Sequence, residues 1–161
     1  MPLIKNGAWA DDDFATVADE APLPDGAAIV SLARFQKERA TLLARNAKLG
    51  VRLASSQSPE LLGEDVHQLS VVVLEFPAFK DGRALSWARL LRTRMGYTGE
   101  IRAQGAFLID QLAHMTRAGF TTFDGDGRIT PEALAHALHE ITYPYQPAPD
   151  GKKTIRELRA R

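Results

Sequence analysis

The strongest chemical signal in the sequence is a group of basic side chains between residues 80 and 102. Two acids, Asp81 and Glu100, accompany six basic residues there, which gives a local net charge of +4 in a chain whose formal net charge is zero. The basic residues are Lys80, Arg83, Arg89, Arg92, Arg94 and Arg102. Arginine binds phosphate, sulfate and carboxylate groups through paired N–H donors, so this composition is typical of an oxyanion site.

The predicted start of a helix lies inside this basic stretch. A buried strand is predicted to end at Phe76, and the next helix to begin near Gly82 with Asp81 as its cap. Arg83 falls in the first turn, where backbone N–H groups without partners and the positive end of the helix dipole attract anions. A second helix is predicted to start at Gly105, just after a strand that ends near Arg102.

Two helix starts side by side would form an oxyanion pocket closed by arginines, with Gln104 as a further polar group. Glu75 and Asp110 are the candidates for a general base if this pocket is catalytic. The alternative is an ion-paired helix rim without a ligand, in which Glu75 and other acids neutralise the arginines. In that case Asp110 and Gln111 would hold the arginines in place.

Residues 123–134, FDGDGRITPEAL, look like a calcium loop but are predicted to form a turn. With Gly127 at the sixth position of such a loop, Thr122 and Ala133 stand where the first and last acidic ligands should be. We therefore expect a tight turn followed by a helix that Thr130 caps.

Other cofactor and metal motifs are missing from the sequence. His136 and His139 have no convincing third and fourth ligand, and the chain has no cysteine. No nucleophile elbow, phosphate-binding loop or dinucleotide fingerprint is present. We expect no metal site and no bound cofactor.

Strands and helices alternate along the chain. The run SVVVLEF, residues 70–76, has no polar alternation, which predicts a strand covered on both faces, as in a parallel sheet. Helices are predicted over 32–49, 82–95, 105–118 and 131–141, with Gly50 as the stop of the first. Further strands are predicted over 27–31, 51–55, 100–103 and 120–123. This order predicts an α/β fold with a mostly parallel sheet of about four to five strands covered by helices, either Rossmann-like or a half-barrel of βα repeats. Ligands of such sheets bind beyond the carboxyl ends of the strands.

The chain length predicts one α/β domain over residues 1–145. Asn6 and Gly7 between short apolar runs predict a β-hairpin within residues 1–25, before a core over 26–145. Residues 146–161 read as a basic C-terminal tail and a candidate for disorder.

The chain has 20 basic residues (Lys and Arg) and 20 acidic residues (Asp and Glu). Its net charge therefore does not favour binding to nucleic acid or to an anionic membrane. No segment has the apolar length of a membrane span, and we expect a cytoplasmic protein. Acids gather over residues 11–25 and basic residues over 152–161. A homo-oligomeric structural or regulatory module, in which the basic edge of one copy meets the acidic stretch of another, is therefore one possible function.

The stretch LEFPAFKDGRALSWARLLRTRMGYTGEIRAQGAFLIDQL, residues 74–112, followed by RAGF, resembles the core signature of an uncharacterised bacterial family, a domain of unknown function. The resemblance covers roughly residues 27–124. Members are often described as probable oxidoreductases or accessory proteins in sulfite reduction, so the resemblance implies a role in assimilatory sulfate reduction beside the sulfite reductase haemoprotein. Many members carry cysteine at the position of Ala118, so thiol chemistry is not expected here.

The sequence leads to three hypotheses about function. The first is an accessory protein of sulfite reduction that binds a small oxyanion or the haemoprotein. The second is an enzyme acting on a small anionic substrate, and the third is the non-catalytic homo-oligomeric module.

Overall fold

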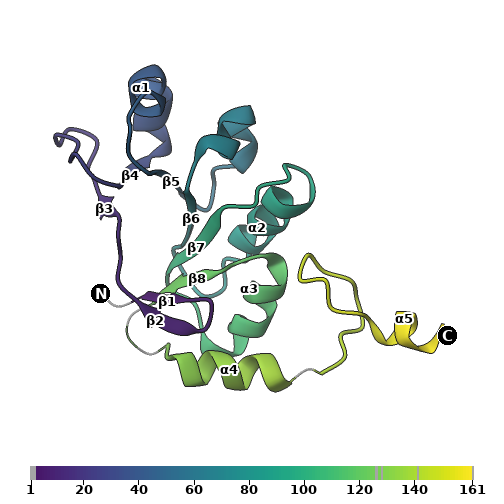
Figure 1. Cartoon of the computed structure of the whole chain (residues 1–161). Coiled ribbons are helices and arrows are strands. Elements are labelled where there is room, and N and C mark those ends of the chain that lie inside the picture. The colour runs from purple at the N-terminus through teal and green to yellow at the C-terminus, as the bar shows by residue number, and fades with distance from the viewer. Residues whose placement is uncertain (1–2, 126, 128, 141, 161) are drawn as a thin grey trace.

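The computed structural model describes residues 3–125, 127, 129–140 and 142–160. Its strands are β1 (Leu3–Lys5), β2 (Ala8–Ala10), β3 (Ala15–Thr16), β4 (Ala28–Ser31), β5 (Leu49–Leu53), β6 (Val71–Phe76), β7 (Glu100–Gly105) and β8 (Thr122–Asp124). Its helices are α1 (Leu32–Leu43), α2 (Arg83–Thr93), α3 (Leu112–Ala118), α4 (Pro131–Glu140) and α5 (Ile155–Arg159), with 3₁₀ segments η1 (Pro59–Gln68) and η2 (Ile109–Gln111). Strands and helices alternate from β4 to α4, which confirms the predicted α/β fold (Figure 1). No helix of the described ranges is long and apolar enough to cross a membrane.

All the strands belong to one mixed sheet of eight, in the order β2-β1-β8-β7-β6-β5-β4-β3. Strands β3 to β8 pair in parallel, while β1 pairs antiparallel with both β8 and β2. The sheet is larger than the predicted one of about four to five strands, because the N-terminal hairpin and β3 extend its two edges. Successive strands from β4 to β8 are neighbours, as in a βα barrel and unlike the reversed order of a Rossmann fold.

The sheet is curled into a half-barrel. Its edge strands, β2 and β3, are joined only by residues 11–14, which we call the strap. The five residue steps across the strap span at most about 18 Å, whereas the edges of a flat sheet of this size would lie about 34 Å apart. The sheet must therefore bend, and Figure 1 shows the strap crossing the open side of the curl.

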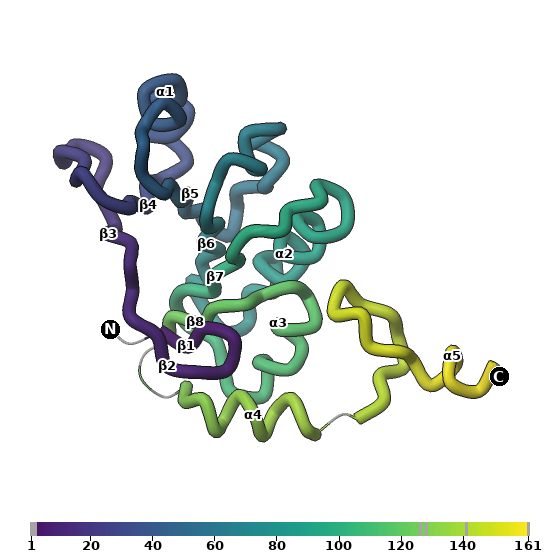
Figure 2. The backbone as a smooth tube through the Cα atoms, viewed as in Figure 1, coloured from purple at the N-terminus to yellow at the C-terminus, as the bar shows by residue number. Residues whose placement is uncertain are grey.

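Helices α1, α2 and α3 lie on the outer face of the curl (Figure 2). This follows from the strand order, because neighbouring right-handed crossovers place every helix on the same face. The main core lies between these helices and the sheet. It includes the outward-facing strand residues Val51, Val72, Leu74, Ile101 and Ala103.

Alternate residues of the same strands face the inside of the curl. Ile29, Val71 and Val73 form a smaller buried cluster there, and Phe14 of the strap packs against it. The strand SVVVLEF is thus covered on both faces, as predicted, although its inner face is covered by the strap and not by a helix.

The predicted boundary after α1 is wrong. The helix ends at Leu43. Leu49, predicted as its last residue, and Gly50, predicted as its stop, both belong to β5. A Cβ on Gly50 would collide with Val71 Cγ1 and lie 2.8 Å from Ile29 Cγ1. Glycine is needed at this position because two neighbouring strands leave no room for a side chain.

The predicted helix start at Gly105 is also wrong. Strand β7 continues through Gly105, which pairs with Phe76 of β6 and has a φ of 111°. A Cβ there would lie 2.5 Å from the Phe76 carbonyl oxygen. Helical structure resumes only at Ile109, because pairing with β6 continues through Gly105 and the Ala106 N–H still donates to the Phe76 carbonyl at 2.8 Å.

Four further predictions concern the N-terminal hairpin, the cap of α4, the calcium-like stretch and the C-terminal segment. The hairpin is confirmed, with φ of 51° at Asn6 and 87° at Gly7. Thr130 Oγ1 accepts a hydrogen bond from the Ala133 N–H at 3.1 Å, which confirms the cap of α4. Asp126, part of the calcium-like stretch, lies outside the described residues. The C-terminal segment includes α5, which Thr154 caps.

Candidate functional site

A row of polar side chains lies on the inner face of the curl at the carboxyl ends of the parallel strands. In the strand register Glu75 lies beside Gln104, and Gln104 lies beside Asp124. Arg52 of β5 reaches Glu75 through an ion pair, Nε to Oε1, at 3.3 Å. Gln104 Nε2 donates to Asp124 Oδ2 at 2.8 Å. We call these four residues the carboxyl-edge row; all are partly exposed, at the place where βα proteins bind ligands.

Arg52 is the one cation of this row, and it is accessible to a ligand. Its side chain is 35% exposed, and the contact with Glu75 is the one polar contact it makes within the described part of the chain. A guanidinium carries five N–H donors, so most of the donors of Arg52 remain for a ligand.

Arg83 lies at the same edge of the sheet, but three of its five N–H donors are already engaged. Asp81 accepts from its Nε at 3.0 Å and from its Nη2 at 2.7 Å, and Ser55 Oγ accepts from Nη2 at 2.9 Å. The Arg83 hydrogen bond, followed by that of Ser55, holds the pKa of the Asp81 carboxyl far below its ordinary value. Gly82, and not Asp81, is the N-cap residue of α2, although Asp81 Oδ1 accepts from the Arg83 backbone N–H at 3.2 Å.

Arg102 lies inside the curl and supports the fold. It is 3% exposed and donates from Nε to Glu100 Oε1 at 3.0 Å and from Nη1 to Asp12 Oδ2 at 2.9 Å. Its guanidinium carbon lies 5.6 Å from the centre of the Phe14 ring. Lys5 Nζ completes the group through an ion pair of 2.6 Å with Glu100. Arg102 therefore fixes the strap across the curl.

The structure does not bring the six predicted cations into one pocket. Lys80 is exposed in the loop before α2, and Arg89 and Arg94 are exposed on α2 and just after it. Arg92 is half-buried near the other end of that helix, where it donates to backbone carbonyls. The strand and the helix of this stretch turn their arginines to opposite faces of the sheet, and the second helix starts later than predicted.

The two candidate bases are placed differently. Glu75 belongs to the carboxyl-edge row, whereas Asp110 is exposed in η2. Gln111 holds two loops together, because its Nε2 donates to the Phe79 carbonyl and its Oε1 accepts from the Leu108 N–H, both at 2.9 Å. Among the described residues no group of three or more His, Asp or Glu is placed to hold a metal ion.

Arg52 and Asp124 were missed in the sequence. Arg52 is the one charge in the strand LGVRL, and its position between two apolar residues signals the opposite face of the sheet. Asp124 reads as part of a turn, although it is the last residue of β8. Both become visible only when the strands are aligned at their carboxyl ends.

The fold and the row define a βα half-barrel protein with a polar site at the carboxyl edge of its sheet. Residues 50–156, well over half of the chain, match the model of a family described as "Bacterial protein of unknown function (DUF934)". The chain therefore belongs to this family, which confirms the resemblance seen in the sequence. A comparison with curated proteins finds no match.

Proposed function

We propose that the protein is an accessory protein of assimilatory sulfate and sulfite reduction, and that its carboxyl-edge row binds a small oxyanion such as sulfite. The pathway is proposed from the sequence resemblance. The observation that carries the oxyanion site is the partly exposed guanidinium of Arg52 at the carboxyl edge of a parallel sheet, whose one polar contact with the described residues is 3.3 Å long.

The carboxylates of the row restrict which anion fits. Arg52 would donate to two oxygens of the anion. Glu75 and Asp124 accept hydrogen bonds but repel negative charge, so a bound anion must donate a proton of its own to one of them. Hydrogen sulfite and hydrogen phosphate carry such a proton, whereas sulfate at neutral pH does not. The row should therefore prefer hydrogen sulfite over sulfate.

Calorimetric titration of the purified protein with sulfite, phosphate and sulfate tests the site. We expect saturable binding of the two protonated anions and weaker binding of sulfate. Arg52→Met should weaken sulfite binding by roughly 10- to 100-fold, because a hydrogen bond to a charged group is worth about 1.5–3 kcal/mol. Arg89→Met, which removes an exposed cation from α2, is the matched control and should bind as the wild type does. An Arg52→Met protein with wild-type affinity would exclude this site.

A docking role toward the sulfite reductase haemoprotein is a second candidate, favoured by apolar side chains on the loops of this edge. Phe79 is 55% exposed, Ile109 45% and Leu108 37%, and Gln111 links the loops that carry them. Exposed apolar groups held close together are typical of contact surfaces.

Sedimentation of the protein with purified sulfite reductase tests the docking role. Phe79→Ser combined with Ile109→Ser should abolish co-sedimentation. Leu61→Ser, at a residue 54% exposed on η1, is the control and should retain it. If the double variant co-sediments with sulfite reductase as well as Leu61→Ser does, these loops are not the contact surface.

A further inference from the structure

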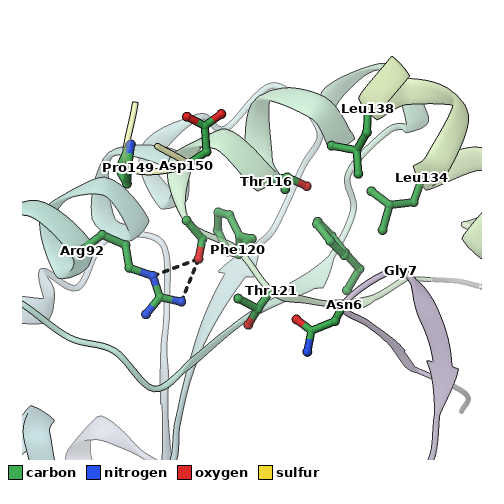
Figure 3. Close-up of a pocket in the computed structure, with 12 residues that line it drawn as sticks. Asn6, Gly7, Arg92, Thr116, Phe120, Thr121, Leu134, Leu138, Pro149 and Asp150 are labelled. Carbon is green, nitrogen blue, oxygen red and sulfur yellow. Dashed lines mark hydrogen bonds between the residues drawn. The ribbon is translucent and has the colours of Figure 1, made fainter. Parts of the chain in front are cut away.

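A cavity of about 350 Å³ lies on the outer side of the sheet, at the amino end of β8. It is open to solvent on one side and is lined by α3, α4, the hairpin turn and the C-terminal segment. Its apolar wall consists of Phe120, Phe123, Leu134, Leu138 and Pro149. Figure 3 shows Arg92 at one end, the two leucines at the other, and Phe120 and Thr116 between them. The volume is at the lower end of the range for ligand pockets, about 300–1,000 Å³.

Arg92 brings a partly desolvated positive charge to this apolar cavity. Its Nη1 donates to the carbonyls of Tyr97 at 2.7 Å and Gly99 at 2.8 Å, while Nε and Nη2 donate to the Gly119 carbonyl at 3.2 and 2.9 Å. These bonds leave one N–H of Nη2 for another acceptor. Burial lowers the pKa of Arg92, and no carboxylate of the described residues contributes to that pKa.

The acid that lines the cavity does not neutralise this cation. Asp150 pairs instead with Arg117, Oδ2 to Nε, at 2.9 Å. A buried charge without a counter-ion is unfavourable, and an anion in the cavity would compensate it.

Thr116 supplies a second unused donor. Thr116 lines the cavity, and its Oγ1 is buried and has no hydrogen-bond partner among the described residues. Buried hydroxyls are nearly always hydrogen-bonded, so this one marks a place for an acceptor from outside the chain. Two unused donors in an apolar cavity select a ligand that has an acceptor head and an apolar body.

We propose that this cavity binds an organic anion, with a carboxylate or sulfonate head at Arg92 and a short apolar chain against Leu134 and Leu138. The site is separate from the carboxyl-edge row, because it lies on the opposite face of the sheet and at the opposite end of the strands. Its occupation therefore does not depend on the proposed oxyanion site.

An NMR titration of the ¹⁵N-labelled protein with hexanoate, 1-hexanesulfonate and hexanol tests the proposal. We expect one or both anions to shift the backbone amides of Thr116, Gly119 and Thr121, and to bind at least about tenfold more tightly than hexanol, because they gain a charged hydrogen bond. The tighter of the two anions identifies the head group. Equal affinity for hexanol and both anions, or shifts that map elsewhere, would overturn the proposal.

Variants separate the cavity from general binding to basic surface. Leu138→Trp should fill the cavity and abolish binding, and Thr116→Val should weaken it several-fold while preserving the shape of the side chain. Arg94→Met, at an exposed cation that follows α2, is the control and should bind as the wild type does. The proposal fails if a folded Leu138→Trp protein binds normally, or if both Thr116→Val and Arg94→Met leave affinity unchanged.

Discussion

Three arginines of the sheet and its carboxyl edge serve different purposes because their partners differ. Arg102 is buried between two carboxylates, Arg83 is engaged by Asp81 and Ser55, and Arg52 makes one long contact. The number of guanidinium donors without partners, and not the local net charge, decides which arginine can receive a ligand. Arg52 meets this condition at the carboxyl edge.

Removal of Arg102 should strongly destabilise the protein. Arg102→Met would leave Glu100 inside the curl without one of its two cations, and would release Asp12 of the strap. Breaking a buried ion pair on one side costs about 3–5 kcal/mol. Urea denaturation should show a loss of this size in the free energy of unfolding. For Arg89→Met the loss should be less than about 0.5 kcal/mol. Equal midpoints for the two variants would contradict a structural role for Arg102.

The stability that Glu100 contributes should depend on pH. Burial raises its pKa, but Lys5 and Arg102 more than offset burial, so the pKa lies below its ordinary value. Such a carboxylate stabilises the fold fully above the pKa of the unfolded chain, about 4.3, and this stability is lost as the pH falls through the folded pKa.

The measurement is urea denaturation of the wild type and Glu100→Gln over a range of pH. The stability difference should be largest above about pH 5 and should decline below about pH 4. A difference that does not vary with pH would show that the charge of Glu100 is not what stabilises the fold.

Among the elements, those with strong local patterns could be predicted from the sequence and those defined by partners could not. The β-branched run of β6 and the Asn6-Gly7 hairpin were found correctly. Gly50 and Gly105 were misread as helix boundaries, because each fits a local glycine rule while strand pairing determines its conformation. The carboxyl-edge row shows the same limit, since Arg52 and Asp124 are far apart in sequence and reach the same edge of the sheet only through strand order.

Gly50 offers a direct test of the packing between strands. Gly50→Ala should destabilise the protein by about 1–3 kcal/mol, because the new methyl group would force Val71 and Ile29 apart. Gly26→Ala is the matched control, since a Cβ there would have nothing within 4 Å. Chemical denaturation of both variants gives the comparison. A stabilised Gly50→Ala protein would mean that the strands separate easily at this point.

The whole molecule is a curled sheet with two chemically different candidate sites. The inner face at the carboxyl edge is polar and carries paired charges, whereas the outer cavity at the amino end of β8 is apolar with two unused donors. The strap closes the curl between them, and the C-terminal segment forms part of the wall of the outer cavity through Pro149 and Asp150.

The C-terminal segment should be released when its main polar attachment is removed. Arg117 donates from Nε to Asp150 Oδ2 at 2.9 Å and from Nη2 to the Gln146 carbonyl at 2.6 Å, and we find α5 beyond this attachment, away from the sheet (Figure 2). The pair is only partly buried, with side chains 21% and 11% exposed, so its loss should cost about 1 kcal/mol.

A change of this size shifts the equilibrium between docked and released segment roughly fivefold. Arg117→Met should therefore speed tryptic cleavage after Lys152 and Lys153 by roughly that factor, while the melting temperature of the body changes little. Asp150→Asn should have a smaller effect, because the contact of Arg117 with the Gln146 carbonyl remains, and the double variant should add little to Arg117→Met, because both changes break the Arg117–Asp150 pair. Arg94→Met controls for the loss of a basic residue. Additive effects of the two single changes would show that Arg117 and Asp150 hold the segment through separate contacts.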